Sequence, residues 1–421
     1  MTISELAKRA RAVSPALAAM SGAEKNAALA AIADALAAAK EELLAANARD
    51  LAATGELTDA VKKRLVFDEK KLAGCIEGLR ALEGLEEPVG RVLQRTELDR
   101  GLVLEKVTCP IGVIGIIFEA RPDALVQIAS LCLKSGNVVL LKGGREAAHT
   151  NAALYEVIAR AGAGAGLPEG WITLLHSRED VGEMLACERE IDLIIPRGSN
   201  AFVRYIMEHT RIPVMGHADG VCHIYVDRAA DFDMALRVIV DAKTQYAAAC
   251  NAVECVLVDR AVAAEFLPLL AGRLEQAGVT WHSDETAMAA IGGLPIANFA
   301  AEYLAFELSV AVVDGLDAAI AHINAYGSHH TDAILTADPA AAERFMNLVD
   351  SADVFWNCST RFADGFRFGF GAEVGIATSK IHARGPVGLE GLLIYKYKLR
   401  GSGQIVEDYA AGRAQFTHKP L

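Results

Sequence analysis

A cysteine in a turn between a predicted helix and a predicted strand is the first candidate for chemistry. Cys250 ends the run Gln245–Cys250, whose three alanines leave room for a substrate. A nucleophilic thiolate needs an accessible turn of this kind. A buried structural cysteine explains the same local pattern, because free thiols are among the most buried side chains. The local residues leave both interpretations open.

Two strand-to-helix turns carry groups that suit an anion. Arg121 follows the predicted strand Ile111–Phe118, where an arginine can bind a carboxylate or phosphate through two parallel hydrogen bonds. Gly198 and Ser199 follow another predicted strand, and the free N–H groups of a helix start attract phosphate. A structural Arg–Asp pair and a simple helix cap are the alternatives.

Two further patterns predict no site. The glycine-alternating run at 161–166 follows a helix and lacks the GxGxxG spacing, which favours a helix-to-strand connection. His322, His329 and His330 have no carboxylate or cysteine at ligand spacing, which indicates a polar loop before a strand. No metal site is predicted.

The composition excludes several classes of function. The chain has 421 residues, with 41 Lys+Arg against 54 Asp+Glu and a net charge of −13. This acidic total argues against nucleic-acid or anionic-membrane binding, and no uncharged apolar run reaches the ~18 residues of a membrane span. Eight scattered cysteines, with no CxxC pair and no charged-then-apolar leader, predict free thiols in a reducing cytoplasm.

The elements that position these residues alternate between β-rich and helical runs. Helices are predicted first, at Lys25–Leu44 behind a Ser21–Glu24 capping box and at Asp68–Leu85. Strands are then predicted at Leu102–Val107, Ile111–Phe118, Asn137–Leu141, Ile172–Leu175, Ile191–Ile195 and Val221–Val226. Helices fall between most of them, at Pro122–Lys134, Ala147–Ala161, Glu179–Cys187 and Ala201–Thr210. This alternation predicts a mostly parallel α/β sheet that binds ligands beyond the carboxyl ends of its strands.

A second alternation begins after Asp231 and predicts a second α/β domain. Its helices are predicted at Asp233–Lys243 and Ala261–Ala277, and its strands at Glu254–Val258, Leu308–Val313 and Ala333–Thr336. The tail Gly391–Val406 alternates tyrosine and lysine, which indicates an exposed strand able to complete a partner's sheet.

Four motifs together resemble the gamma-glutamyl phosphate reductase family, within the aldehyde dehydrogenase superfamily. They are Pro110–Pro122, Ser130–Asn137, Lys243–Gln245 leading to Cys250-Asn251, and His382–Pro386. The resemblance spans nearly the whole chain. It implies NADPH-dependent reduction of L-glutamyl 5-phosphate to L-glutamate 5-semialdehyde and phosphate, a step of proline biosynthesis. A related acyl-phosphate or acyl-CoA reductase and a catalytically silent binding protein are the alternatives.

The resemblance also implies an interleaved architecture. The cofactor-binding domain comprises residues 1–92 and 108–220, and the catalytic domain comprises residues 221–385. The oligomerisation flap and tail comprise residues 93–107 and 386–421. The fold class is therefore aldehyde dehydrogenase-like, with two parallel-sheet α/β domains and a small flap. A homo-oligomer, either dimer or tetramer, and a glutamate kinase partner are expected.

Several residues acquire roles from this resemblance. Cys250 matches the nucleophile that attacks the acyl phosphate to form a thioester, with its own backbone N–H as an oxyanion donor. Arg121 stands where many superfamily members carry an asparagine, and is expected to bind the phosphate or oxyanion. The glutamate base of thioester-hydrolysing members is replaced here by Gly216, as expected where water must be excluded. Other candidate substrate contacts are Asn251, Arg361 and Arg384, and for the last two a structural salt bridge is the alternative.

The cofactor residues follow in the same way. Lys142 matches the superfamily lysine that holds the adenosine ribose. Arg145 stands where NAD-preferring members often carry a glutamate. Because its positive charge would attract a 2′-phosphate, NADPH is predicted as the cofactor. Gly198 and Ser199 resemble the pyrophosphate-facing helix start, and Glu302 resembles the glutamate that binds the nicotinamide ribose.

Overall fold

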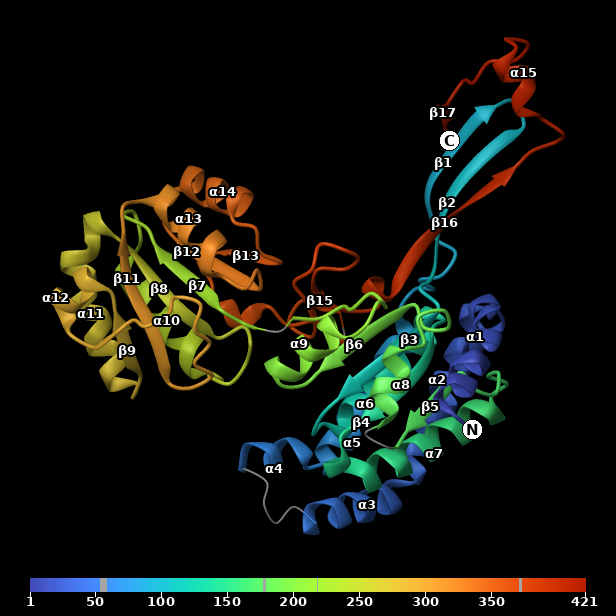
Figure 1. Ribbon diagram of the computed structural model, residues 1–421, viewed down its shortest axis with the longest axis horizontal. Coiled ribbons are helices and arrows are strands. Elements are labelled where there is room, and N and C mark those ends of the chain that lie inside the picture. Colours follow the sequence, from blue (N-terminus) through green and yellow to red (C-terminus); the bar gives the residue numbers. More distant parts are fainter. Residues whose placement is uncertain (54–58, 177–178, 218, 371–372) are drawn as a thin grey trace.

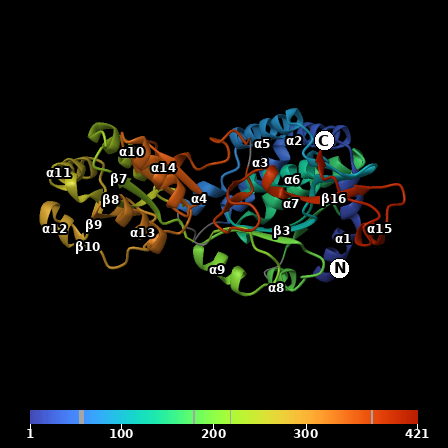
Figure 2. The ribbon, with the colours of Figure 1, turned by 90° about the horizontal axis from the view of Figure 1, so that it is seen from above.

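Two α/β bodies and a projecting antiparallel sheet make up the molecule (Figure 1). The computed structural model describes residues 1–53, 59–176, 179–217, 219–370 and 373–421. The aldehyde dehydrogenase-like class, with two parallel sheets, is confirmed within this part of the chain. The bodies lie side by side, and the antiparallel sheet extends away from one of them (Figures 1 and 2).

The first body contains a four-stranded parallel sheet in the order β5-β4-β3-β6. Its strands are β3 (Val113–Phe118), β4 (Val138–Gly143), β5 (Ile172–Leu175) and β6 (Leu193–Arg197). Every residue of β3 and β4 is buried, because helices cover both faces of the sheet. The helices are α1 (Ile3–Ala19), α2 (Gly22–Ala38), α3 (Lys40–Ala52), α4 (Asp59–Leu65), α5 (Glu69–Gly84), α6 (Pro122–Ser135), α7 (Ala148–Gly164), α8 (Glu179–Leu185) and α9 (Asn200–Glu208).

The second body contains a seven-stranded sheet in the order β10-β9-β11-β8-β7-β12-β13. Its strands are β7 (Cys222–Val226), β8 (Val253–Asp259), β9 (Thr280–Ser283), β10 (Leu294–Pro295), β11 (Glu307–Val313), β12 (Thr331–Leu335) and β13 (Asp353–Trp356), all paired in parallel. Two apolar clusters pack on its opposite faces. They draw on α10 (Phe232–Thr244), α11 (Arg260–Gln276), α12 (Glu285–Ile291), α13 (Leu316–Tyr326) and α14 (Pro339–Leu348).

Segments far apart in the chain build the projecting sheet, whose order is β16-β2-β1-β17. Its strands are β1 (Val92–Asp99), β2 (Leu102–Pro110), β16 (Leu393–Arg400) and β17 (Lys419–Pro420), with α15 (Val406–Ala410) beside them. The predicted exposed strand in the tail is confirmed, because every residue of β16 after Leu393 is exposed. Whether this edge pairs with a partner stays a prediction.

Several features differ from the sequence-based expectations or add to them. The predicted helix Lys25–Leu44 is two helices that meet at Ala39, a break that an alanine-rich stretch without glycine or proline does not reveal. A hairpin of β14 (Gly375–Ala377) and β15 (Gly385–Val387) was not predicted. Val374 and Ala377, expected in the catalytic domain, pack in the core of the first body, so the chain returns to that body before residue 385.

Candidate active site

Cys250 lies in the turn between α10 and β8, at the amino edge of the seven-stranded sheet. Its carbonyl oxygen accepts a hydrogen bond from the Cys222 thiol, at 3.2 Å. The backbone of Gly220 passes so close that a Cβ there would lie 2.1 Å from the same oxygen. Only glycine fits at that position, and the turn that holds the thiol is therefore fixed from the side of β7.

Two imidazoles flank the Cys250 thiol. His330, directly before β12, places its Nε2 3.2 Å from Cys250 Sγ. His217 packs edge-on against His330, with the ring centroids 4.9 Å apart, and its donor atoms lie within 4.8 Å of both neighbours. His330 is held in turn by Thr331 Oγ1, which lies 2.8 Å from its Nδ1. The backbone carbonyl of Ile376 lies 2.9 Å from Nδ1 of His217.

This arrangement favours the thiolate. Burial by itself would raise the pKa of the Cys250 thiol, but the charges of His330 and His217 and their hydrogen bonds hold it well below its usual range. Burial would likewise lower the pKa of His217, yet the negative charge on Cys250 raises that pKa to about 9. A thiolate beside an imidazolium is the form of cysteine that attacks an electrophilic carbon.

The carboxyl edge of the other sheet contributes cations. Arg197 ends β6, and register pairs it with Phe118 at the end of β3, two strands that lead to Arg121 and Ser199. Burial first, and then the neighbouring charge of Arg121, lower the pKa of Arg197, while Cys250 and Glu373 act in the opposite sense. Arg197 thus lies within range of the charges of both Arg121 and Cys250.

The two sheets use opposite edges. Ligand candidates of the first sheet follow the carboxyl ends of its strands, as predicted. Cys250 and His330, in contrast, precede β8 and β12 and lie at an amino edge, where the sequence analysis did not expect a ligand. Glu302 links the two bodies, because it accepts hydrogen bonds from the Asn200 side chain and, at 2.9 Å, from the Gly220 N–H.

A cavity of about 480 Å³ brings together the first group of cofactor candidates. Lys142, Gly143 and Arg145 line it from the end of β4, and Phe202 lines it from α9. The Lys142 ammonium donates to the Gly143 carbonyl at 2.6 Å, and burial lowers its pKa. The cavity therefore offers Lys142 as a hydrogen-bond donor and Arg145 as a cation, beside a wall lined by glycine. These groups suit a phosphorylated ribose.

The start of α9 adjoins the same cavity. Ser199 is the N-cap residue, and its side chain makes no capping hydrogen bond. Its backbone N–H donates to the Glu119 carboxylate at 3.2 Å, and a Cβ on Gly198 would lie 2.9 Å from that carboxylate. An oxyanion therefore already occupies this helix start, and burial raises the pKa of Glu119. A pyrophosphate at this place requires Glu119 to move.

The substrate candidates separate into different environments. Arg361 is buried, its Nε donates to Gln245 Oε1 at 3.0 Å, and burial lowers its pKa while the charge of Cys250 acts in the opposite sense. Asn251 is also buried, and its amide donates to the Ala363 carbonyl at 2.8 Å, which fixes the turn carrying Arg361. Arg384 instead makes a salt bridge with Asp350 at 3.0 Å, the structural alternative considered above.

The sequence analysis missed three residues of this site. Arg197 and His217 were given no role, and His330 was treated as part of a polar loop. The signal for both histidines lay in their position, since each comes shortly before a predicted strand, as Cys250 does. Strands next to one another in a parallel sheet carry such residues on one edge.

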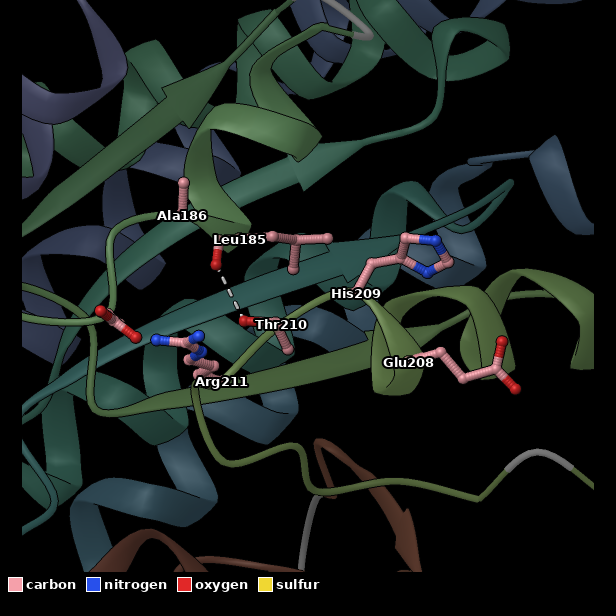
Figure 3. A pocket seen from close by; sticks show the side chains of 7 residues that line it. Leu185, Ala186, Glu208, His209, Thr210 and Arg211 are labelled. Atoms are coloured by element: carbon pink, nitrogen blue, oxygen red, sulfur yellow. Dashed lines mark hydrogen bonds between the residues drawn. The ribbon is translucent and has the colours of Figure 1, made fainter.

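A second cavity, of about 420 Å³, lies where α8 and α9 end (Figure 3). Glu188, Glu208, His209 and Arg211 contribute its polar lining. Figure 3 shows the Thr210 hydroxyl pointing to the Leu185 carbonyl, with which it makes a 2.9 Å hydrogen bond. Its lining residues, which the structure describes, include none of the residues expected in the site.

Comparison with known proteins places this site in a family. Residues 1–294 match the model of the aldehyde dehydrogenase family. The chain belongs to the aldehyde dehydrogenase family. Of its curated relatives, the gamma-glutamyl phosphate reductase of Ruminiclostridium cellulolyticum is 58% identical and that of Pelotomaculum thermopropionicum 57% identical, each over 100% of this chain and 98% of the relative.

Solved structures agree with this family. The gamma-glutamyl phosphate reductase of Thermotoga maritima superposes with a TM-score of 0.93 at 36% identity, over 96% of this chain and 100% of that one. An acetylating aldehyde dehydrogenase of Geobacillus thermoglucosidasius superposes with a TM-score of 0.68 at 17% identity, over 96% of this chain and 97% of that one, which shows the fold alone. The family and fold expected from the sequence are confirmed.

Proposed function

We propose that this chain catalyses the NADPH-dependent reduction of L-glutamyl 5-phosphate to L-glutamate 5-semialdehyde and phosphate, in proline biosynthesis. The observation that carries the proposal is a thiol held as a thiolate by His330 and His217, with cations from the other body nearby. The relatives that share full-length similarity are named for this reaction. The alternatives, another acyl reductase or a silent binding protein, are not favoured.

The thiolate makes the first bond. Cys250 Sγ attacks the carbonyl carbon of the acyl phosphate, the carbon–oxygen bond to the phosphate breaks, and phosphate leaves with the electron pair. The Cys250 backbone N–H stabilises the developing oxyanion. Arg121 and Arg197 bind the phosphate as it leaves, because guanidinium groups match its oxygens through paired hydrogen bonds. Arg361, fixed by Gln245, binds the substrate carboxylate.

The thioester is protected from water. Gly216 offers no carboxylate that could act as a general base toward water. When bound, NADPH supplies the hydride that reduces the thioester. The resulting thiohemiacetal alkoxide collapses and its carbon–sulfur bond breaks. The aldehyde is released, and the Cys250 sulfur is again a thiolate.

Each cofactor residue binds a different part of the dinucleotide. Lys142 binds the adenosine ribose, Arg145 its 2′-phosphate, and Gly198 with Ser199 the pyrophosphate at the start of α9. Glu302, at the junction of the bodies, binds the nicotinamide ribose. Arg145 is exposed on the cavity wall, as a residue that meets a peripheral phosphate must be.

Replacing Arg145 by glutamate is expected to lower the NADPH/NADH ratio of kcat/KM by about 10–100-fold. A charge-assisted hydrogen bond contributes about 1.5–3 kcal/mol, and the glutamate would also repel the 2′-phosphate. Initial rates with each cofactor measure the ratio. The matched control is Arg160→Glu, an exposed charge reversal on α7 that should leave the ratio unchanged. An unchanged ratio in Arg145→Glu would show that this charge does not select the cofactor.

The reaction itself is tested in the reverse direction. Purified chain with L-glutamate 5-semialdehyde, phosphate and NADP should reduce NADP, and omission of phosphate should abolish the rate because phosphate is a substrate. A panel of short aliphatic aldehydes, with phosphate or with coenzyme A, tests the alternative reductases. A clear preference for any of them over the semialdehyde would overturn the proposed substrate.

The assembly is proposed on the same basis. The flap and tail, residues 93–107 and 386–421, associate with a second copy through the exposed edge of β16, where Tyr395, Tyr397 and Leu399 lie on the surface. A dimer or tetramer follows, and a glutamate kinase delivers the unstable acyl phosphate. A mass of 44.7 kDa in solution, that of one chain, would contradict the oligomer.

We place the enzyme in the cytoplasm, where thiols stay reduced. Among the described residues, no helix is long and apolar enough to cross a bilayer.

A further inference from the structure

A second cysteine–histidine cluster lies inside the second body, apart from Cys250. It consists of His223 on β7, Cys255 on β8 and His322 on α13, and their potential donor atoms all lie within 4.8 Å of one another. Register pairs His223 directly with Cys255, so the two side chains share one face of adjacent strands. The helix α13 covers that face, because its Ile323 packs in the same apolar cluster as Cys255.

Two ring nitrogens of this cluster have no nitrogen or oxygen partner among the described residues, although the Cys255 thiol acts on His223. His223 and Cys255 are fully buried. Within the part of the chain that the structure describes, neither Nε2 of His223 nor Nε2 of His322 has a hydrogen-bond partner, although both atoms are buried. A buried polar atom left without a partner destabilises the fold by about 1–3 kcal/mol. A ligand that binds both nitrogen atoms and the thiol would therefore remove this cost.

A neighbouring carboxylate fixes the orientation of His223. Asp332 Oδ1 lies 3.1 Å from Nδ1 of His223 and accepts the His223 backbone N–H at 2.7 Å. The Ser351 hydroxyl donates to the other carboxylate oxygen. Because a carboxylate only accepts, Nδ1 of His223 carries the proton and Nε2 is directed to the cluster. Histidines that bind metals in proteins are held by a carboxylate in the same way.

We propose that His223, Cys255 and His322 bind one Zn²⁺ ion, with Asp332 as the hydrogen-bonded support of His223. A thiolate and two neutral imidazoles are the donors that zinc prefers, and they leave one position of a tetrahedron open. Cys255 loses its proton to solvent when the ion binds. Bond lengths of about 2.0–2.3 Å place tetrahedral donors roughly 3.5 Å apart, so donors that now lie within 4.8 Å of one another must approach by up to about 1.5 Å.

The partly exposed side of His322 provides the entrance. Its ring packs against those of Phe299 and Tyr326, at centroid distances of 4.8 Å and 4.7 Å, and Tyr326 is exposed. A bound ion would join α13 to β7 and β8 and so stabilise the second body. No sequence motif indicates this site, because its ligands are 32 and 67 residues apart and form no short spacing pattern.

The experiment uses the full chain with Cys250→Ser, since the catalytic cluster offers the same kinds of donor. After chelator treatment and dialysis, Co²⁺ is titrated and the near-ultraviolet thiolate-to-cobalt absorption is followed; zinc content is measured by mass spectrometry. We expect one ion per chain. Adding Cys255→Ser should remove the absorption and weaken binding by more than about 100-fold, since loss of an outer partner alone weakens it by about 10–100-fold.

Two further variants separate binding from folding. Cys132→Ser, at a fully buried thiol on α6, should bind Co²⁺ like the parent. His322→Gln should lose the ion while keeping the circular dichroism of the parent, and Zn²⁺ should raise the melting temperature only in chains with all three ligands. Absence of Co²⁺ absorption in the Cys250→Ser parent, or equal absorption with Cys255→Ser, would overturn the proposal. Neither result depends on the reductase reaction.

Discussion

Replacing Cys250 by serine is expected to lower kcat/KM for phosphate-dependent oxidation of L-glutamate 5-semialdehyde by at least about 10⁴-fold. Loss of a catalytic nucleophile has effects of this size or larger. The structure gives the reason, because His330 and His217 stabilise a thiolate, whereas a serine hydroxyl is not ionised by two imidazoles. No thiohemiacetal forms from the aldehyde, so there is no hydride donor for NADP. The rate of NADP reduction measures the loss.

Cofactor binding separates this effect from unfolding. Cys250 lies at the amino edge of the second sheet, and the cavity with Lys142 and Arg145 lies in the first body. Cys250→Ser should therefore bind NADPH with a dissociation constant within about twofold of the parent. Cys109→Ser, a partly exposed thiol on β2, is the matched control and should keep full activity. If Cys250→Ser retains a tenth of the parental rate, another group is the nucleophile.

Most of the fold between residues 102 and 277 could be predicted from the sequence. Buried strands there are short apolar runs separated by amphipathic helices, and β5 has the predicted bounds Ile172–Leu175. The pattern weakens in the second body after residue 277, where the exposed ends of β9 and β10 lack an apolar run, and neither strand was predicted. The break between α2 and α3 at Ala39 also has no local signal, since alanine suits a helix equally well on either side.

The site was less accessible to prediction than the fold. Cys250 was found from its turn and from the resemblance, and its local environment allowed a buried structural thiol equally well. His217 and His330 reach it from 33 residues before and 80 residues after in the chain. Their contact depends on β8, β7 and β12 being consecutive in the sheet, an order that no local pattern encodes. Arg121 and Arg197 meet only because β3 and β6 are neighbours.

Replacing His330 by alanine is expected to raise the pH at which Cys250 reacts with iodoacetamide by about one to two units. The thiolate is the reactive form, so the rate rises with pH through the pKa of the thiol. In the parent, His330 and His217 hold that pKa well below its usual range, and alkylation should remain fast below neutral pH. Without His330, one stabilising charge and one hydrogen bond are lost, while burial continues to favour the neutral thiol.

The sign and the size of this shift identify the role of the imidazole. His330→Gln should fall between parent and alanine variant, because its amide can donate a hydrogen bond but carries no charge. His209→Ala, an exposed histidine at the end of α9 whose ring bonds to the Tyr205 carbonyl, is the control and should leave the profile unchanged. If His330→Ala alkylates with the parental profile, His217 alone sustains the thiolate. In that case a matching shift must appear in His217→Gln, because one imidazolium beside Cys250 is the least that its lowered pKa requires.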